Sequence, residues 1–301
     1  MIPRVIRKLC IAPSRELASD TMDAAFDTVR GMPLFATFKQ ILAENWQWRH
    51  QIWDLAKIDL VKTYRGAALG KVWLFTKPSV YMFVYWFTLS VGMRSAHDIN
   101  GEPFLLWLAV GIVPWFFMSD AINTGSDVYH RYAYLVNRIK FPLAVISTFY
   151  ILSIMIIFAA TMAIVIGVAA IAGVHFTRYV LQLPLVMVMM FVFWTAWSMM
   201  LSPLGAISKD FANLIKTLSM PFFWLSGILF QLTSLPHIGL VIMRFNPVAW
   251  CCEAVRSCFV YKQWIWSDPT ELLPFLVFFA VVVILAVRNY RRLSKEVPDV
   301  L

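Results

Sequence analysis

Residues 143–172 read LAVISTFYILSIMIIFAATMAIVIGVAAIA, a run without a single charged side chain. A helix crosses the hydrocarbon core of a bilayer with roughly 20 predominantly apolar residues. This run is longer than that, so it predicts a membrane-spanning helix. Interior prolines do not exclude such helices, because packed membrane helices tolerate them. Five further apolar runs of spanning length lie at about 72–94, 104–125, 179–207, 213–235 and 271–290.

The composition of the 301-residue chain is also that of a membrane protein. Hydrophobic residues make up 60% of the chain and charged residues 14%, whereas soluble domains average about 45–50% and about 25%. A net charge of +9 is compatible with nucleic-acid binding. The basic residues, however, lie in the N-terminal third and in short connectors between apolar runs. That distribution reports membrane orientation, so we expect no nucleic acid as a partner.

The positions of Lys and Arg predict the topology. Six spans place both chain ends on one side of the membrane, and only five of the 26 Lys and Arg residues fall on the other side. These five are Arg94, Arg178, Arg244, Arg256 and Lys262. Because cytoplasmic loops carry the excess positive charge, we expect both termini in the cytoplasm. The predicted fold is an all-α membrane protein with six transmembrane helices, an N-terminal amphipathic interface helix and re-entrant helices between spans five and six.

Residues 34–62 predict the interface helix. Its apolar side chains recur at helical spacing, at Phe35, Phe38, Leu42, Trp46, Trp53, Ala56 and Leu60. Charged residues such as Lys39 and Lys57 fall elsewhere, although Arg49 interrupts the apolar stripe. Such a helix suits the membrane interface plane; a soluble helix packed on a partner is the alternative. The predicted domains are an extension (1–33), the interface helix with an opening motif (34–71), the six-span domain (72–295) and a tail (296–301).

Residues 236–268 are too apolar for a plain loop, and neither of their two pieces can cross a bilayer. A short apolar piece at 238–245 ends at a break, and a helix follows from about 248 to 262. Re-entrant helices explain this pattern, because non-helical backbone at membrane depth needs protein or a water-filled cavity around it. The predicted gate residues are Asn246, Pro247, Glu253 and Arg256. A purely structural salt bridge is the simpler interpretation of Glu253 and Arg256, which lie three residues apart.

The sequence patterns do not indicate catalysis, a metal site or an ATP site. H-E-x-x-H, G-x-S-x-G, C-x-x-C and histidine clusters are absent from the sequence. Residues 66–72, GAALGKV, resemble a phosphate-binding loop, but only three residues separate the glycines and Val72 stands where a Ser or Thr is needed. We therefore expect no enzyme activity, no metal and no cofactor in this chain.

Four short motifs follow one another along the chain. They are YRGAALGKVW (64–73) with Lys77 and Pro78 after it, LVNRIKFP (135–142), SKDF (208–211), and NPVAW (246–250) with Glu253 and Arg256 after it. In this order they resemble motifs of the ABC type-2 polysaccharide-export permeases, which include the teichoic-acid and O-antigen export permeases. The resemblance covers about residues 34–295. Lys209 replaces the arginine of the family's R-D pair, which keeps the charge but loses the planar fork.

The resemblance implies the membrane half of an exporter. Such permeases form homodimers and bind two copies of a separate cytoplasmic ATPase, which holds ATP and Mg. They move a lipid-linked polysaccharide across the bacterial inner membrane through a channel at the dimer centre. The connector between spans two and three would dock on the ATPase through Tyr129, Arg131, Tyr132, Leu135 and Arg138. A drug or small-lipid exporter of the same superfamily, a membrane-embedded glycosyltransferase and an ion-coupled carrier are the alternatives.

Two further groups of residues suit such a pathway. Aromatic rings offer sliding contacts to the C–H faces of sugars, and the candidates within the spans are Trp86, Trp115, Phe116, Trp194, Phe222 and Trp224. Cations near the cytoplasmic ends of spans one and five could attract an anionic headgroup of the cargo, and they are Arg65, Lys71, Lys77, Lys209 and Lys216. Lipid contact and helix packing are the alternative roles of the aromatics, and orientation of the chain is the alternative role of the cations.

The topology is testable by cysteine labelling. A membrane-impermeant thiol reagent added from outside should react with cysteines placed at Asn100 and Trp266, because both positions lie in predicted outer loops. It should not react with cysteines placed at Tyr134 or Asn213, which lie near cytoplasmic connectors. Labelling from outside at Tyr134 would contradict the six-span topology with both ends inside.

Overall fold

The computed structural model describes residues 33–63, 72–93, 97–139, 141–293 and 297. Over these residues the regular structure is helical, and β-type pairing is limited to one bridge between Ile99 and Glu102. The all-α fold predicted from the sequence is therefore confirmed for the described part of the chain. The N-terminal extension up to residue 32 and the predicted cations Arg65 and Lys71 lie outside that part.

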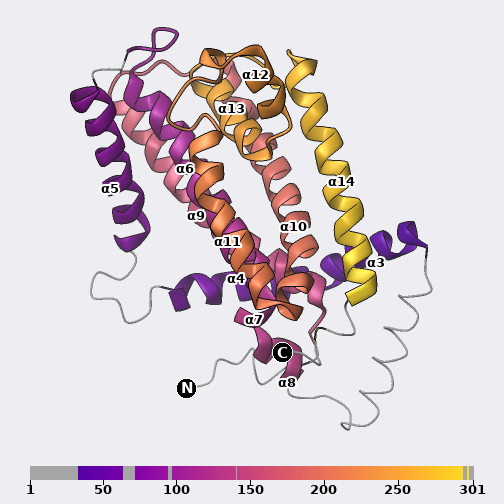
Figure 1. Cartoon of the computed structure of the whole chain (residues 1–301). Helices are drawn as coiled ribbons and strands as arrows, with labels where there is room; N and C mark the ends of the chain where they lie inside the picture. Colours follow the sequence, from indigo (N-terminus) through magenta and orange to yellow (C-terminus); the bar gives the residue numbers. More distant parts are fainter. Residues whose placement is uncertain (1–32, 64–71, 94–96, 140, 294–296, 298–301) are drawn as a thin grey trace, which may run out of the picture.

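Four helical segments among the described residues are long and apolar enough to cross a membrane. They are α6 (Phe104–Asn123) with the turns η3 (Gly125–Asp127) and α7 (Val128–Arg131), α9 (Leu143–Ile171), η4 (Arg178–Gln182) with α10 (Leu183–Ile207), and α14 (Pro269–Leu293). Figure 1 shows that they run side by side between the two ends of the molecule. The chain is thus a multi-pass membrane protein, and four of the predicted spans are confirmed as helices.

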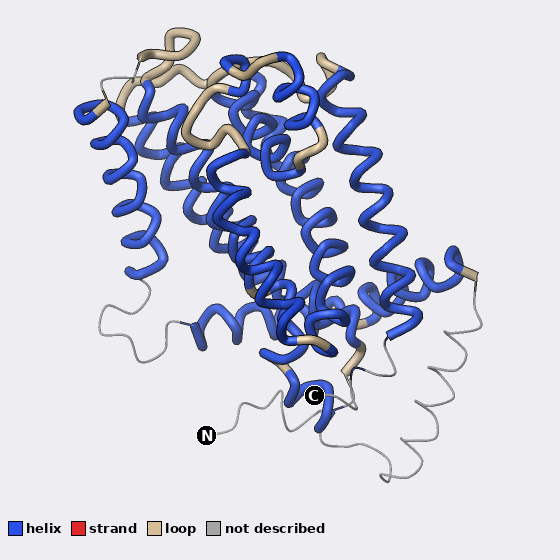
Figure 2. The backbone as a smooth tube through the Cα atoms, in the orientation of Figure 1, coloured by secondary structure: helices blue, strands red, loops and turns tan. Residues whose placement is uncertain are grey.

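The other two predicted spans form shorter helices. Helix α5 (Trp73–Phe87) continues into a π-helical turn, η2 (Thr88–Gly92), and α11 (Lys209–Leu225) has 17 residues. At 1.5 Å per residue, α11 is about 25 Å long, shorter than a hydrocarbon core of about 30 Å. It ends well before residue 235 because Gly227 turns the backbone into the left-handed region, at φ 69°. Both helices lie against α6 and run along the bundle (Figure 2).

The segment between α11 and α14 forms two short helices at one end of the molecule. After the turn η5 (Leu232–Ser234), α12 (His237–Arg244) and α13 (Pro247–Phe259) meet at an angle of 92°. The predicted break between them is confirmed, and α13 ends at Phe259 rather than near 262. Every residue of α13 except Glu253 is buried, whereas no residue of α12 is buried. Helix α13 therefore belongs to the core, and α12 lies on the surface.

Helix α6 lies at the centre of the bundle. Within its most apolar window 78% of the residues are buried, against 22–39% for the other three long segments. It packs on α5, α9, α11 and α13. Helices α10 and α14 pack against each other through aromatic rings. The ring centroid of Phe193 lies 5.4 Å from that of Phe275 and 5.6 Å from that of Phe279. The remaining helices are arranged around this core.

The turn that follows α6 is fixed to α10. Ser198 Oγ and Ser202 Oγ each donate a hydrogen bond to the carbonyl oxygen of Gly125, at 2.8 Å. Gly205 allows the two backbones to approach so closely that a Cβ atom there would overlap the carbonyl oxygen of Ser126. The connector between α6 and α9 is therefore held by side chains and backbone of a spanning helix.

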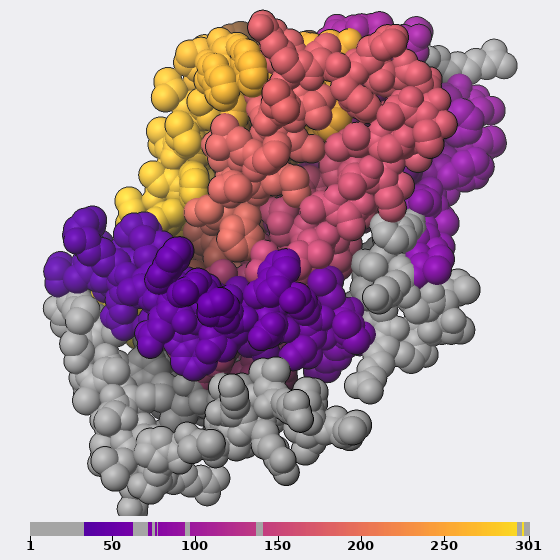
Figure 3. Space-filling model, turned by 180° about the vertical axis from the view of Figure 1, so that it is seen from behind, coloured from indigo at the N-terminus to yellow at the C-terminus, as the bar shows by residue number. Residues whose placement is uncertain are grey.

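Helices α3 (Leu34–Gln47) and α4 (Arg49–Thr63) lie across the end of the bundle opposite α12 and α13 (Figures 1 and 3). They pack on α9 and α14, and α8 (Ala133–Ile139) lies at the same end. The side that faces the bundle carries Thr37, Ile41, Ile52, Ala56 and Asp59, all of them buried. The predicted apolar stripe is therefore wrong in part: Phe38 packs against the core, whereas Phe35, Trp46 and Trp53 are exposed on the same side as Lys39 and Lys57, which the prediction places off the stripe.

The contact at Gly205 is testable by stability. The substitution Gly205→Ala should lower the free energy of unfolding by about 1–3 kcal/mol, because the methyl group forces the backbones of α10 and η3 apart. Thermal unfolding of the purified protein in detergent measures the effect. Gly167→Ala on α9 is the control, since a Cβ there meets nothing within 4 Å. An equal loss in both variants would show that the close approach at Gly205 is not the cause.

Candidate functional site

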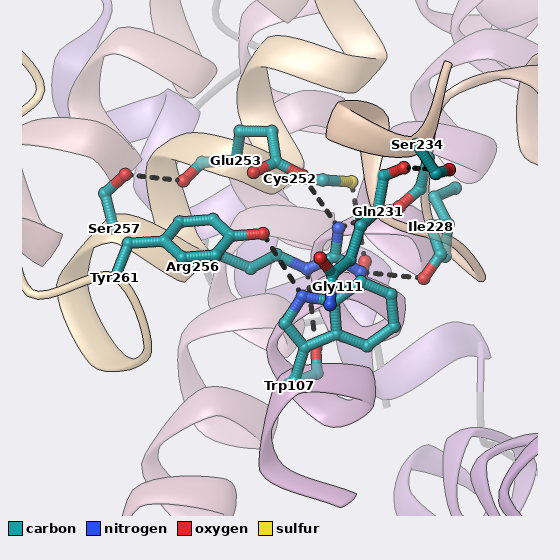
Figure 4. Close-up of polar contacts among 11 residues, drawn as sticks. Trp107, Gly111, Ile228, Gln231, Ser234, Cys252, Glu253, Arg256, Ser257 and Tyr261 are labelled. Carbon is teal, nitrogen blue, oxygen red and sulfur yellow. Dashed lines mark hydrogen bonds and ion pairs between the residues drawn. The ribbon is translucent and has the colours of Figure 1, made fainter. Parts of the chain in front are cut away.

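Arg256 of α13 is fully buried at the α12–α13 end of the molecule (Figure 4). Its guanidinium donates hydrogen bonds to the carbonyl oxygens of Gly227 and Ile228, each at 2.7 Å, and to the Glu253 carboxylate at 2.8 Å. Its Nε donates to the carbonyl oxygen of Trp107 at 3.4 Å, and its Cζ lies 3.7 Å from the centroid of the Trp107 ring. One side chain thus joins α6, α13 and the turn after α11.

This network satisfies the conditions for burying a cation. A buried charge needs a counter-charge and hydrogen-bond partners, since it has lost its water. Glu253 supplies the charge and three backbone carbonyls supply acceptors. Gly111 of α6 supplies the space, because a Cβ atom there would overlap the guanidinium of Arg256. The structural salt bridge expected for Glu253 and Arg256 is present as one part of a larger network.

Asn246 and Pro247 determine where α13 begins. The side-chain oxygen of Asn246 accepts a hydrogen bond from the Val248 N–H at 3.0 Å, and its amide donates to Ser226 Oγ at 2.9 Å. Pro247 follows at the first helical position, where a backbone N–H would have no partner in any case. All four predicted gate residues therefore lie where α13 meets the turn after α11. Their role in gating stays a prediction.

A cavity of about 490 Å³ opens beside this network. Its walls include Trp250, Glu253 and Tyr261, and Arg244 and Glu271 add a charge of each sign. The Tyr261 hydroxyl accepts a hydrogen bond from Trp107 Nε1 at 3.2 Å. Burial, assisted by the charge of Glu253, raises the pKa of Tyr261 to about 12, so the hydroxyl stays protonated at neutral pH. The cavity offers hydrogen-bond donors and acceptors beside aromatic surface.

Three of the predicted channel aromatics meet in one cluster. Trp115 of α6 and Trp224 of α11 both contact Phe223, with ring centroids 5.4 Å and 5.6 Å apart. Phe116 of α6 contacts Tyr81 of α5 at 5.7 Å. These rings, together with Tyr85, which lies 5.4 Å from Phe223, are called the aromatic cluster below. It joins α5, α6 and α11.

The aromatic cluster is open on its outer side. Tyr81 is 46% exposed and Trp224 55% exposed. The other three predicted aromatics lie apart from it. Trp86 contacts Phe83 of its own helix, Phe222 packs against the core, and Trp194 of α10 is fully buried within the core. Trp194 therefore fills the core of the chain in this arrangement.

The predicted cytoplasmic cations are described only in part. Lys216 of α11 pairs with Asp127 of η3 at 2.8 Å, and both side chains are partly exposed. Lys209 is exposed at the start of the same helix. The side chain of Lys77 lies outside the described residues, as do Arg65 and Lys71. Lys216 thus has a structural contact that ties α11 to the turn after α6.

The connector between α6 and α9 presents few of its predicted contact residues to the surface. Tyr129, Tyr132 and Leu135 are buried within the chain, whereas Arg131 is exposed. The side chain of Arg138 lies outside the described residues. The buried members hold the connector in place, and their part in binding an ATPase stays a prediction.

Asp59 of α4 binds the connector through a hydrogen bond from Tyr132. The Tyr132 hydroxyl donates to one of its carboxylate oxygens, and Ser153 Oγ of α9 donates to the other at 2.8 Å. Asp59 was not among the candidates from the sequence. Its spacing after Ile52 and Ala56 is that of one helix side, and both of these residues are buried. A carboxylate in such a row is the sequence signal for this contact.

The fold and these contacts define a helical multi-pass membrane protein with an open aromatic cluster and a bent pair of helices at one end. Residues 50–260 match the model of the family described as ABC-2 type transporter. The chain therefore belongs to the ABC-2 type transporter family, in agreement with the four sequence motifs. It is a transmembrane permease of an ABC transporter.

Two curated relatives are similar to most of the chain. The O-antigen export system permease protein RfbA of Myxococcus xanthus is 24% identical over 222 residues, which cover 73% of this chain and 84% of the relative. The O-antigen export system permease protein RfbA of Klebsiella pneumoniae is 21% identical over 203 residues, which cover 67% of this chain and 77% of the relative. Both matches span the greater part of each protein.

The substitution Arg256→Met tests the buried network. It should lower the free energy of unfolding by about 3–5 kcal/mol, because Glu253 loses its counter-charge and the carbonyls of Gly227 and Ile228 lose their donors. Thermal unfolding in detergent measures the loss. Arg244→Met is the matched control, since Arg244 is exposed on α12 and its replacement should cost less than about 0.5 kcal/mol. Similar stability of the two variants would rule out a structural role for Arg256.

Proposed function

We propose that the chain is the permease subunit of an ATP-driven exporter of a lipid-linked polysaccharide, of the O-antigen or teichoic-acid type, in the bacterial inner membrane. The observation that carries the proposal is the similarity to two O-antigen export permeases over 73% and 67% of the chain. The aromatic cluster supports it, because aromatic faces bind the C–H faces of sugar rings without trapping them.

In this proposal six helices cross the membrane. These six are the four long segments, α5 with its extension η2, and α11. The bilayer adapts to the shorter helices by thinning, at a modest cost in free energy. Helices α3 and α4 lie in the cytoplasmic interface, α12 and α13 form a re-entrant pair at the outer side, and both termini are cytoplasmic. The exposed cations Arg131 and Lys209 support this orientation, since they lie at the α3–α4 end.

Two copies of the chain form a homodimer whose channel runs along the aromatic cluster. Each cluster is open on its outer side, where Tyr81 and Trp224 are exposed. A partner with the same surface would enclose these rings between the two copies, since a two-fold interface uses one patch twice. Sugar units would then pass between two facing aromatic surfaces, as an export pathway for a polymer requires.

Two copies of a separate ATPase supply the energy, and this chain holds no cofactor. The connector after α6 is the proposed docking element, with Arg131 and Tyr134 exposed to a partner. Coupling requires that ATP binding shift an equilibrium between two arrangements of the permease. Tyr132 could transmit this change, because it is hydrogen-bonded to Asp59 of α4, which is in turn hydrogen-bonded to Ser153 of α9. A movement of the connector would therefore displace α4 and α9.

Cells that lack this chain test the cargo. They should lose surface polysaccharide and accumulate lipid-linked polymer on the cytoplasmic side, because synthesis continues without export. Returning the gene should reverse both effects, as measured by labelling of surface glycan and by extraction of lipid-linked glycan. Unchanged surface polysaccharide together with a new sensitivity to small drugs would contradict the proposal and favour a drug exporter.

Variants expressed in the same cells test whether the connector couples the ATPase to export, independently of the identity of the cargo. Arg131→Glu with Tyr134→Ala should insert into the membrane and yet fail to restore export, because the docking surface is reversed in charge and loses a ring. Arg178→Glu with Tyr179→Ala is the matched control, since it changes another arginine–tyrosine pair, 5.4 Å apart, on η4, which packs against α13 at the opposite end of the molecule. Export by the first double variant at the level of the control would remove the connector from the coupling mechanism.

A further inference from the structure

The outward side of α3 and α4 carries a continuous row of aromatic, aliphatic and basic side chains. Its members follow one another at intervals of three or four residues and are all exposed. This basic aromatic row consists of Phe35, Lys39, Leu42, Trp46, Arg49, Trp53 and Lys57. Phe35 and Trp46 are 67% and 72% exposed, so the contacts made by the described residues leave the row uncovered.

Each cation of the row lies over an aromatic ring. Lys39 Nζ is 4.7 Å from the centroid of Phe35, and Lys57 Nζ is 4.9 Å from the centroid of Trp53. Arg49 Cζ is 5.1 Å from the ring of Trp46. A cation above a ring keeps N–H groups free for an anion while its aliphatic stem covers apolar surface. The arrangement is therefore built for a ligand that is anionic and apolar at once.

The charge of this side is of one sign. None of the exposed residues between 34 and 62 is acidic. Asp59 is buried against the bundle, and Glu44 accepts hydrogen bonds from Gln40 at 2.8 Å and from Tyr290 of α14 at 3.0 Å. Two of the three carboxylates in this segment thus bond within the protein, the third, Asp54, is partly exposed, and the cations of the row are exposed. The exposed charge of the row is therefore positive.

The position of the basic aromatic row in the fold indicates which kind of partner contacts it. Helices α3 and α4 lie across the bundle at the level where the spanning helices end, and they form the outer surface there (Figure 3). A second copy of the chain does not fit, because a two-fold contact would bring like charges together. A layer of phosphate headgroups next to acyl chains matches both the cations and the exposed aromatic rings.

We propose that the basic aromatic row binds the phosphate groups of anionic glycerophospholipids in the leaflet at the α3–α4 end. This inference rests on the interface position given to α3 and α4 in the proposed function, and it is independent of the exported cargo. Bound headgroups would hold α4 in place, and α4 in turn holds the connector through Asp59 and Tyr132. The anionic lipid thereby becomes part of the support of the connector.

Lipids that co-purify with the full chain test the proposal. Protein extracted from membranes of known composition should carry phosphatidylglycerol, relative to phosphatidylethanolamine, at a several-fold higher ratio than the membrane, as quantified by mass spectrometry. The triple variant K39Q/R49Q/K57Q should bring this ratio down to that of the membrane. An unchanged ratio would overturn the proposal. Enrichment of a polyprenyl-linked phosphate in place of phosphatidylglycerol would also overturn it, because the row would then bind the cargo.

Two controls show whether charge in this row is the cause. The variant K39R/R49K/K57R keeps every charge and should keep the enrichment. Arg178→Gln removes a cation that also lies over an aromatic ring, at the other end of the molecule, and it should keep the enrichment as well. Loss of enrichment in either control would contradict the proposal. Because lipid is measured without ATPase or polymer, a wrong assignment of the cargo leaves this result unaffected.

Discussion

The burial of one arginine sets the geometry of the α12–α13 end. A fully buried guanidinium is tolerated only if its charge and its N–H groups find partners. Arg256 finds them on three segments, which must therefore meet: α13 itself, α6 at Trp107, and the turn at Gly227 and Ile228. Gly111 leaves the space that this meeting needs. Helix α13 is consequently part of the core, although it is too short to span a membrane and is bent by 92° from α12.

The opposite end is organised by contacts of the same kind on the connector. The carbonyl oxygen of Gly125 accepts hydrogen bonds from two serines of α10, and Asp127 forms an ion pair with Lys216 of α11. The Tyr132 hydroxyl donates a hydrogen bond to Asp59 of α4. A movement of the connector must therefore displace or break contacts with several helices at once. Helix α6 connects the two ends, because its first half carries the arginine network and its last residues continue into the connector.

Local composition was enough to predict the four long spanning helices and the break at Asn246 and Pro247, because each depends on adjacent residues only. The packing side of residues 34–62 was not predictable, since exposed aromatic rings suit lipid as well as protein. The same ambiguity applies to Trp194 and Trp115, which stand in similar apolar runs, although Trp194 is fully buried in the core and Trp115 contacts Phe223 of the aromatic cluster. The partners of Arg256 were also hidden, because most of them are backbone carbonyls from distant segments and leave no mark in the sequence.

Arg256 makes α13 a fixed part of the core, while α12 stays on the surface. Amide hydrogen exchange of the protein in lipid nanodiscs, followed by mass spectrometry, measures this directly. We expect the amides of α13 to exchange as slowly as those of α6 and the amides of α12 to exchange much faster. Arg256→Met should accelerate exchange in α13. Equally fast exchange of α12 and α13 in the unaltered protein would show that Arg256 does not fix α13 in the core.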